Sequence, residues 1–181
     1  SSSRLGRSLG LDLLGSKICD FDCLYCEVGP TRVHTSERRP YVPAVTVLDE
    51  LEHWLGRGHL SPDHITLGGM GEPCLNSEID AVITGIRELA PGVPVAVLTN
   101  SSLLHDPAVV HALQGCDVVL PSMDTLVQEE LKRLNRPCTP LSASAMAAAL
   151  LDFSTVYKGR IFLEILLVRG INDTGQNKAL L

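Results

Sequence analysis

The sequence predicts an α/β fold with parallel strands, because short apolar runs alternate with helical patterns along the chain. Five runs are typical of buried strands and cover residues 9–14, 64–67, 93–99, 117–121 and 160–168. Each interval between them is long enough for a helix. Such units are right-handed and either close into a barrel or open into a doubly wound sheet. In both architectures the functional residues lie at the carboxyl ends of the strands.

Apolar stripes at helical spacing predict a helix in each of the first two intervals. The stripes are Val45, Leu48, Leu51, Trp54 and Leu55, and then Ile79, Val82, Ile83, Ile86 and Leu89. Asn76 and Ser77 are expected to start the second of these helices. Asp106 as N-cap and Pro107 at the first position predict a third helix, which Gly115 ends. Helical patterns also cover residues 125–134 and, rich in alanine, 142–151.

Composition indicates one globular domain. The chain has 181 residues, 45% of them hydrophobic and 20% charged, which argues against a disordered tail, a collagen-like fibre or a disulfide miniprotein. A net charge of -6 provides no domain-wide positive field for nucleic acid, so any such contact must be local. No run reaches the roughly 18 apolar residues of a membrane span. The start lacks the apolar core of a signal peptide, and we expect a soluble, cytoplasmic protein.

The strongest chemical signal is the C-x3-C-x2-C run of Cys19, Cys23 and Cys26. Three thiolates on one tight loop can reach the corners of one face of an iron-sulfur cube, whereas a structural zinc site normally has four ligands in two spaced pairs. A disulfide would leave one of the three cysteines unpaired. An iron-sulfur cluster is therefore favoured, with zinc and a redox dithiol as the alternatives.

A glycine-rich turn, residues 68–73, follows the second predicted strand. Phosphate binding is disfavoured, because Glu72 would repel an anion and no P-loop Lys follows. Glycines let backbone carbonyls approach a ligand closely, and such an edge suits an ammonium group. The alternative is a strand-to-helix turn without a ligand.

With Tyr25 at the aromatic position of C-x3-C-x-aromatic-C, the sequence resembles the radical S-adenosylmethionine (SAM) superfamily. The resemblance implies an oxidoreductase-type enzyme in which Cys19, Cys23 and Cys26 hold a 4Fe-4S cluster with one iron open for SAM. An electron from the cluster then cleaves SAM to a 5′-deoxyadenosyl radical, which abstracts a hydrogen from the substrate.

The resemblance also implies SAM-binding residues on the cysteine loop and at the strand ends. They are Tyr25, Gly69, Gly71, Glu72, Asn100, Ser122, Asp124 and Val168. The glycine turn would contact the amino group, and Asn100 the methionyl end. Ser122 and Asp124 would lie near the ribose or the substrate. Tyr25 and the backbone around Leu166 to Val168 would lie near the adenine. Asn, Ser and Asp also commonly end strands, and Asp124 could instead be the N-cap of the next helix.

For the fold, the resemblance implies a parallel partial TIM-type barrel. Family barrels have six βα units, so residues 1–181 are expected to form one radical SAM core domain that lacks the sixth strand at its C-terminus. The fifth strand, 160–168, would then pair only with residues 117–121 and leave an apolar edge.

The family resemblance indicates the substrate and partners less directly than it indicates the cofactors. In detail the chain resembles predicted iron-sulfur oxidoreductases related to wyosine-type tRNA-base enzymes, which implies a tRNA nucleoside as substrate; a glycyl-radical enzyme is the alternative. The resemblance implies an external electron donor of flavodoxin or ferredoxin type. From another class, the chain could be a zinc-binding module that kept the fold without the chemistry.

The remaining cysteines and a basic stretch have less definite roles. Cys74 is expected at the same rim as the cluster loop and Cys116 at the opposite end, so the two cannot share a metal. These two and Cys138 are best interpreted as plain buried thiols. The basic residues Arg32, His34, Arg38 and Arg39 form either a solvated face or a guide for an anionic substrate or reductant.

Overall fold

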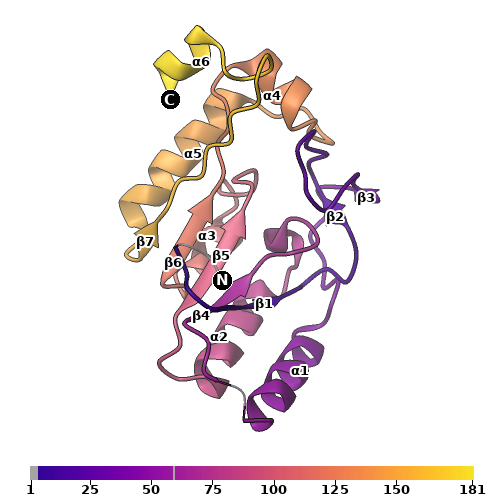
Figure 1. Ribbon diagram of the computed structural model, residues 1–181, viewed down its shortest axis with the longest axis vertical. Helices are drawn as coiled ribbons and strands as arrows, with labels where there is room; N and C mark the ends of the chain where they lie inside the picture. Colours follow the sequence, from indigo (N-terminus) through magenta and orange to yellow (C-terminus); the bar gives the residue numbers. More distant parts are fainter. Residues whose placement is uncertain (1–3, 59) are drawn as a thin grey trace.

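A computed structural model describes residues 4–58 and 60–181, in an α/β architecture with a parallel sheet (Figure 1). Residues 1–3 and 59 lie outside the described part of the chain. The first residues of the segment considered above as a signal peptide are therefore not described. The strands are β1 (Ser8–Leu11), β2 (Ile18–Cys19), β3 (Val33–His34), β4 (His64–Leu67), β5 (Val95–Thr99), β6 (Val118–Pro121) and β7 (Arg160–Ile161). The helices are α1 (Ala44–Gly56), η1 (Pro73–Leu75), α2 (Ile79–Leu89), α3 (Pro107–Leu113), α4 (Gln128–Leu134), α5 (Ala143–Val156) and α6 (Gly175–Leu180).

The main sheet has five strands in the order β1-β4-β5-β6-β7, and every neighbouring pair is parallel. Strands β1 and β7 form its two edges, so the sheet is an open, partial barrel rather than a closed one. The register pairs Leu11 with Leu67 and Thr99 with Pro121. The carboxyl ends of the strands therefore meet at one rim, and the predicted fold class is confirmed.

Helices cover one face of the sheet. Val97 of β5 and Val119 of β6 belong to a buried cluster with Ile83 of α2 and Phe153 of α5. The opposite face carries a smaller cluster in which Leu5 covers residues of β5 and β6. Both faces of the two central strands are thus buried, which is why their sequences are almost continuously apolar.

The last predicted strand is much shorter than expected. Only Arg160–Ile161 forms β7, which pairs with β6 alone, as predicted, and a single bridge joins Glu164 to Ser122. Beyond it, side chains rather than a strand ladder satisfy the backbone: the Leu166 N–H donates to Asp124 and the Val168 N–H donates to Asn172. An apolar run therefore did not suffice to make a strand here.

Other boundaries differ because side chains compete locally with regular structure. The first strand ends at Leu11, since the Asp12 carboxylate accepts from the N–H groups of Leu14 and Gly15 in a turn. The first helix forms as predicted, but Val45 is 62% exposed and Val47 takes its place in the core.

Two other helices begin later than predicted. Helix α2 begins at Ile79, and Asn76 instead accepts a hydrogen bond from the N–H of Glu78. Helix α4 begins at Gln128 rather than residue 125, because the Thr125 hydroxyl accepts from the N–H of Val127.

Asp106 caps α3 as predicted. The small parallel sheet of β2 and β3 was not anticipated. Within the described residues, no helix combines the length and apolarity needed to cross a membrane.

Candidate functional site

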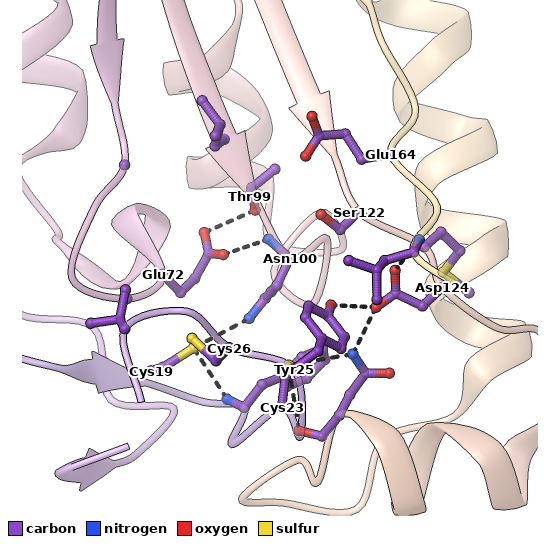
Figure 2. A pocket seen from close by; sticks show the side chains of 18 of the residues that line it. Cys19, Cys23, Tyr25, Cys26, Glu72, Thr99, Asn100, Ser122, Asp124 and Glu164 are labelled. Atoms are coloured by element: carbon purple, nitrogen blue, oxygen red, sulfur yellow. Dashed lines mark hydrogen bonds between the residues drawn. The ribbon is translucent and has the colours of Figure 1, made fainter. Parts of the chain in front are cut away.

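A cavity of about 450 Å³ opens at the carboxyl ends of β4, β5 and β6 (Figure 2). Its lining includes nearly all the residues singled out in the sequence, namely Cys19, Cys23, Tyr25, Cys26, Gly69, Gly71, Glu72, Asn100, Ser122 and Asp124. Val168 is not part of this lining, and Leu166 is its nearest counterpart there. The topology therefore gathers side chains from separate βα units around one space.

The cysteine loop, residues 19–26, begins at the end of β2 and is anchored to the end of α4. Backbone N–H groups of Asp22 and Leu24 donate to the carbonyls of Asn135 and Leu134, both at 2.9 Å. Within the loop, the N–H of Cys26 donates to the Cys23 carbonyl. The loop thus has a defined shape that points all three thiols toward the cavity.

Each of the three sulfurs has an N–H donor from a different part of the chain. The Lys17 ammonium lies 2.8 Å from Cys26 Sγ, and the side-chain amide of Asn135 lies 3.4 Å from Cys23 Sγ. The Asn100 amide approaches Cys19 Sγ at 3.8 Å. Such donors stabilise sulfur that carries negative charge.

Burial disfavours the thiolate form of two of these cysteines. It raises the pKa of Cys23 to about 11 and raises that of Cys19 well above its usual range. A bound metal centre supplies the positive charge that such thiolates need.

Glu72 is buried, and its carboxylate is already fully engaged within the chain. It accepts from Cys74 N–H at 3.0 Å, Thr99 Oγ1 at 2.8 Å and Asn100 N–H at 2.6 Å. Burial raises its pKa to about 7. Glu72 therefore ties the glycine turn to the end of β5 while lining the cavity.

The two glycines of the turn serve different purposes. A Cβ on Gly71 would lie 1.7 Å from the carbonyl oxygen of Ile18. The close approach expected there for a ligand is thus made within the chain, between the turn and β2. Gly69 has a left-handed φ of 110° and space where a Cβ would be, so glycine is needed for the backbone conformation.

Asp124 is not a helix cap. The N-cap position of α4 is Val127, and the Asp124 carboxylate accepts instead from Tyr25 Oη, the Asn135 amide and the Leu166 N–H. It joins the cysteine loop, the end of α4 and the segment after β7. Ser122 lies beside it in the lining and forms a bridge to Glu164.

Cys74 and Cys116 are buried in the main apolar cluster, as expected for plain thiols. Cys138 is only partly buried, and its N–H donates to the Asp20 carbonyl. Among the basic residues, Arg38 is no solvated side chain, because it donates to the Cys74 carbonyl and pairs with Asp106 at 3.0 Å.

The donor set fits an iron-sulfur cluster, because three thiol side chains line one cavity and thiolates are the ligands that hold such clusters. Among the described residues, no group of three His, Cys, Asp or Glu side chains is placed to hold a single metal ion. The Asn135 amide oxygen is also buried without a hydrogen-bond partner in the cavity wall.

An open parallel sheet with a three-cysteine loop at its carboxyl rim is the arrangement of an α/β protein that binds an iron-sulfur cluster. A sequence profile of the radical SAM superfamily matches residues 13–175, and the chain belongs to that superfamily. It is 32% identical to a UPF0026 protein of Helicobacter pylori (strain J99), over 99% of this chain and 58% of the relative. The chain thus spans under two thirds of that relative's length.

Solved structures share the fold. The structure of native anSMEcpe with bound AdoMet superposes with a TM-score of 0.63 and 17% identity, over 86% of this chain and 43% of that one. The structure of TYW1 with a lysine-pyruvate adduct gives a TM-score of 0.59 and 16% identity, over 94% of this chain and 60% of that one. At these identities the likeness concerns the fold.

The sequence did not reveal two residues that contact the cysteine sulfurs. Lys17 stands two positions before Cys19, where an isolated lysine gives no pattern to interpret. Asn135 is 112 residues from Cys23, so only the fold brings them together. Polar residues just after predicted elements are the nearest available signal, and Asn135 follows α4 in that way.

Proposed function

We propose that Cys19, Cys23 and Cys26 hold a 4Fe-4S cluster and that the adjoining cavity binds SAM. When bound and reduced, the cluster supplies the electron that breaks a sulfonium bond of SAM, yielding methionine and a 5′-deoxyadenosyl radical. Residues 1–181 act as one radical SAM core domain. Membership of the superfamily and the three thiols lining one cavity support this proposal.

In this proposal the chain positions and encloses the reactants. Thr99 and Asn100, fixed by the buried Glu72, form the floor at the end of β5. The backbone of the turn at Gly69 offers carbonyl acceptors for the amino group of SAM. Phe21, Leu131 and Met146 give the cavity an apolar wall that excludes water from a reactive radical.

The observation that carries the proposal is the joint placement of the cysteine loop and the strand ends. Tyr25 of the loop donates to Asp124 at the end of β6, and Asn100 at the end of β5 approaches Cys19. A cluster on the loop would therefore face the same space as the residues that the family resemblance assigns to SAM.

The proposal also names the substrate from which the 5′-deoxyadenosyl radical abstracts a hydrogen atom. We favour a nucleoside in tRNA, which the resemblance of the sequence to the relatives of wyosine-type tRNA-base enzymes implies, over a glycyl-radical enzyme. The proposed electron donor is an external flavodoxin or ferredoxin.

Reductive SAM cleavage tests the proposed activity. Anaerobically reconstituted protein, mixed with SAM and dithionite, should release 5′-deoxyadenosine, which chromatography measures. Cys23→Ala should release none, whereas Cys116→Ala, at a buried thiol outside the cavity lining, should match the wild type. Absence of 5′-deoxyadenosine from wild-type protein with a full cluster would overturn the proposal.

A further inference from the structure

Lys17 introduces a positive charge into a cavity that is otherwise acidic. Among the described residues of its lining, Lys17 is the one lysine or arginine, against four carboxylate residues, Glu27, Glu72, Asp124 and Glu164. Lys17 is 5% exposed. A buried lysine requires a partner of opposite charge or an acceptor.

The partner of the ammonium is a cysteine sulfur. Lys17 Nζ lies 2.8 Å from Cys26 Sγ, which is shorter than the N–H contacts made to the sulfurs of Cys19 and Cys23. The other donors are neutral: the Asn135 amide lies 3.4 Å from Cys23 Sγ, and Cys19 Sγ accepts from the Phe21 N–H at 3.4 Å and the Asn100 amide at 3.8 Å. Lys17 therefore differs from them in both charge and distance.

The backbone of Lys17 is fixed at the start of β2. Its carbonyl accepts from the N–H groups of Arg32 and Val33, each at 3.1 Å. The next residue, Ile18, contacts the glycine turn, where the Glu72 N–H donates to the Ile18 carbonyl at 3.2 Å. These contacts leave the buried side chain directed at the cysteine loop.

We infer that Lys17 is a positioning residue that keeps its ammonium on the Cys26 sulfur in the loaded protein and raises the reduction potential of the cluster. The inference rests on the proposed function, because it requires a cluster on the three cysteines. It assigns to Lys17 a role in setting how readily the enzyme accepts an electron.

Electrostatics gives the sign of the effect. Reduction transfers one electron from an external donor, which is oxidised, to the cluster, and adds a negative charge beside three thiolates and four carboxylate residues. A cation at hydrogen-bond distance from a ligand sulfur stabilises the reduced state more than the oxidised state. Hydrogen bonds to the sulfurs act in the same direction.

The test compares Lys17→Met, Lys17→Arg and Lys158→Met. Methionine keeps an unbranched stem without charge or donors, and arginine keeps both the charge and the donors. Lys158 is exposed and lines a different cavity, beside Cys116, so Lys158→Met removes the same charge away from the site. Each protein is reconstituted anaerobically without SAM, analysed for iron and sulfide, and titrated for midpoint potential by electron paramagnetic resonance.

We expect Lys17→Met to have a lower midpoint potential than the wild type, while Lys17→Arg and Lys158→Met stay close to it. Retention of iron by Lys17→Arg but not by Lys17→Met would also support the inference, since the charge would then be needed to hold the loop. A wild-type potential in Lys17→Met would overturn it. An equal change of midpoint potential in Lys17→Arg and Lys17→Met, or an equal loss of iron from both, would also overturn the inference. A wild-type protein without iron and sulfide would instead overturn the proposed function.

Discussion

Tyr25 donates its hydroxyl hydrogen to the carboxylate of Asp124, across 99 residues of sequence. The bond fastens the cysteine loop to the carboxyl end of β6. Burial and the nearby Cys23 and Asp124 raise the pKa of Tyr25 well above its usual range, so the hydroxyl remains a donor. The geometry of the loop thus depends on a contact that exists only in the folded chain.

Replacing Tyr25 by Phe should lower the free energy of unfolding by about 1.5–3 kcal/mol, the usual contribution of a hydrogen bond to a charged group. Urea unfolding of the unloaded protein measures this. Tyr41→Phe is the matched control, because that hydroxyl donates to the Glu37 carbonyl at an exposed position. Equal losses in the two variants would contradict the importance of the Asp124 contact.

Replacing Gly71 by Ala should disrupt the turn, because the added Cβ would lie 1.7 Å from the Ile18 carbonyl oxygen. Overpacking against backbone is expected to reduce stability by at least about 2 kcal/mol. Gly10→Ala, where a Cβ meets nothing within 4 Å, serves as the comparison in thermal unfolding. A Gly71→Ala protein as stable as Gly10→Ala would show that the turn does not need this close approach.

The stability of the unloaded protein should fall as pH rises, in part through Glu72. Its pKa is about 7 in the folded chain and about 4.3 in an unfolded one. Between these values the folded state holds a proton that the unfolded state has lost, so the free energy of unfolding decreases with pH.

Glu72→Gln should show a shallower decrease between about pH 5 and about pH 8 in urea unfolding. Part of the decrease should remain, since burial also raises the pKa of Asp20. If the free energies of unfolding of Glu72→Gln and the wild type decreased in parallel with pH, Glu72 would be excluded as a cause of the decrease.

Asn172 should be essential to the segment that follows β7. Its buried amide donates to the carbonyls of Asp124 and Leu166 and accepts from the Val168 N–H. Asn172→Ala removes the partners of the Leu166 carbonyl and the Val168 N–H, while Asn177 still donates to the Asp124 carbonyl. The variant should reduce stability by about 2 kcal/mol. Gln176→Ala, at an exposed position of α6, should change it little; similar unfolding midpoints for the two would refute this role.

The sequence predicted where the central strands of the main sheet lie, because their apolar runs are buried on both faces, as in β5 and β6. The same criterion failed for residues 160–168, where Leu163 and Leu167 are each 48% exposed. An apolar run shows that burial is favourable, but it does not show that a neighbouring strand is present. In this segment Asp124 and Asn172 take the place of a ladder partner.

At the site, the sequence predicted the residues that belong to a local motif. It did not predict the residues that only the fold brings to the cysteine sulfurs. The spacing of Cys19, Cys23 and Cys26 is visible in eight residues of sequence. The contacts of Asn135 and Lys17 with two of these sulfurs depend on α4 and on β2. The family resemblance placed the backbone around Leu166 to Val168 near the adenine. In the structure Leu166 lines the cavity, and the Val168 N–H donates to Asn172.

The iron and sulfide content of anaerobically reconstituted protein tests the central claim most directly. We predict about four iron and four sulfide per chain, the composition of one cube, with loss in Cys19→Ala, Cys23→Ala and Cys26→Ala and retention in Cys116→Ala. A full cluster in Cys23→Ala, or zinc without sulfide in the wild type, would contradict the claim.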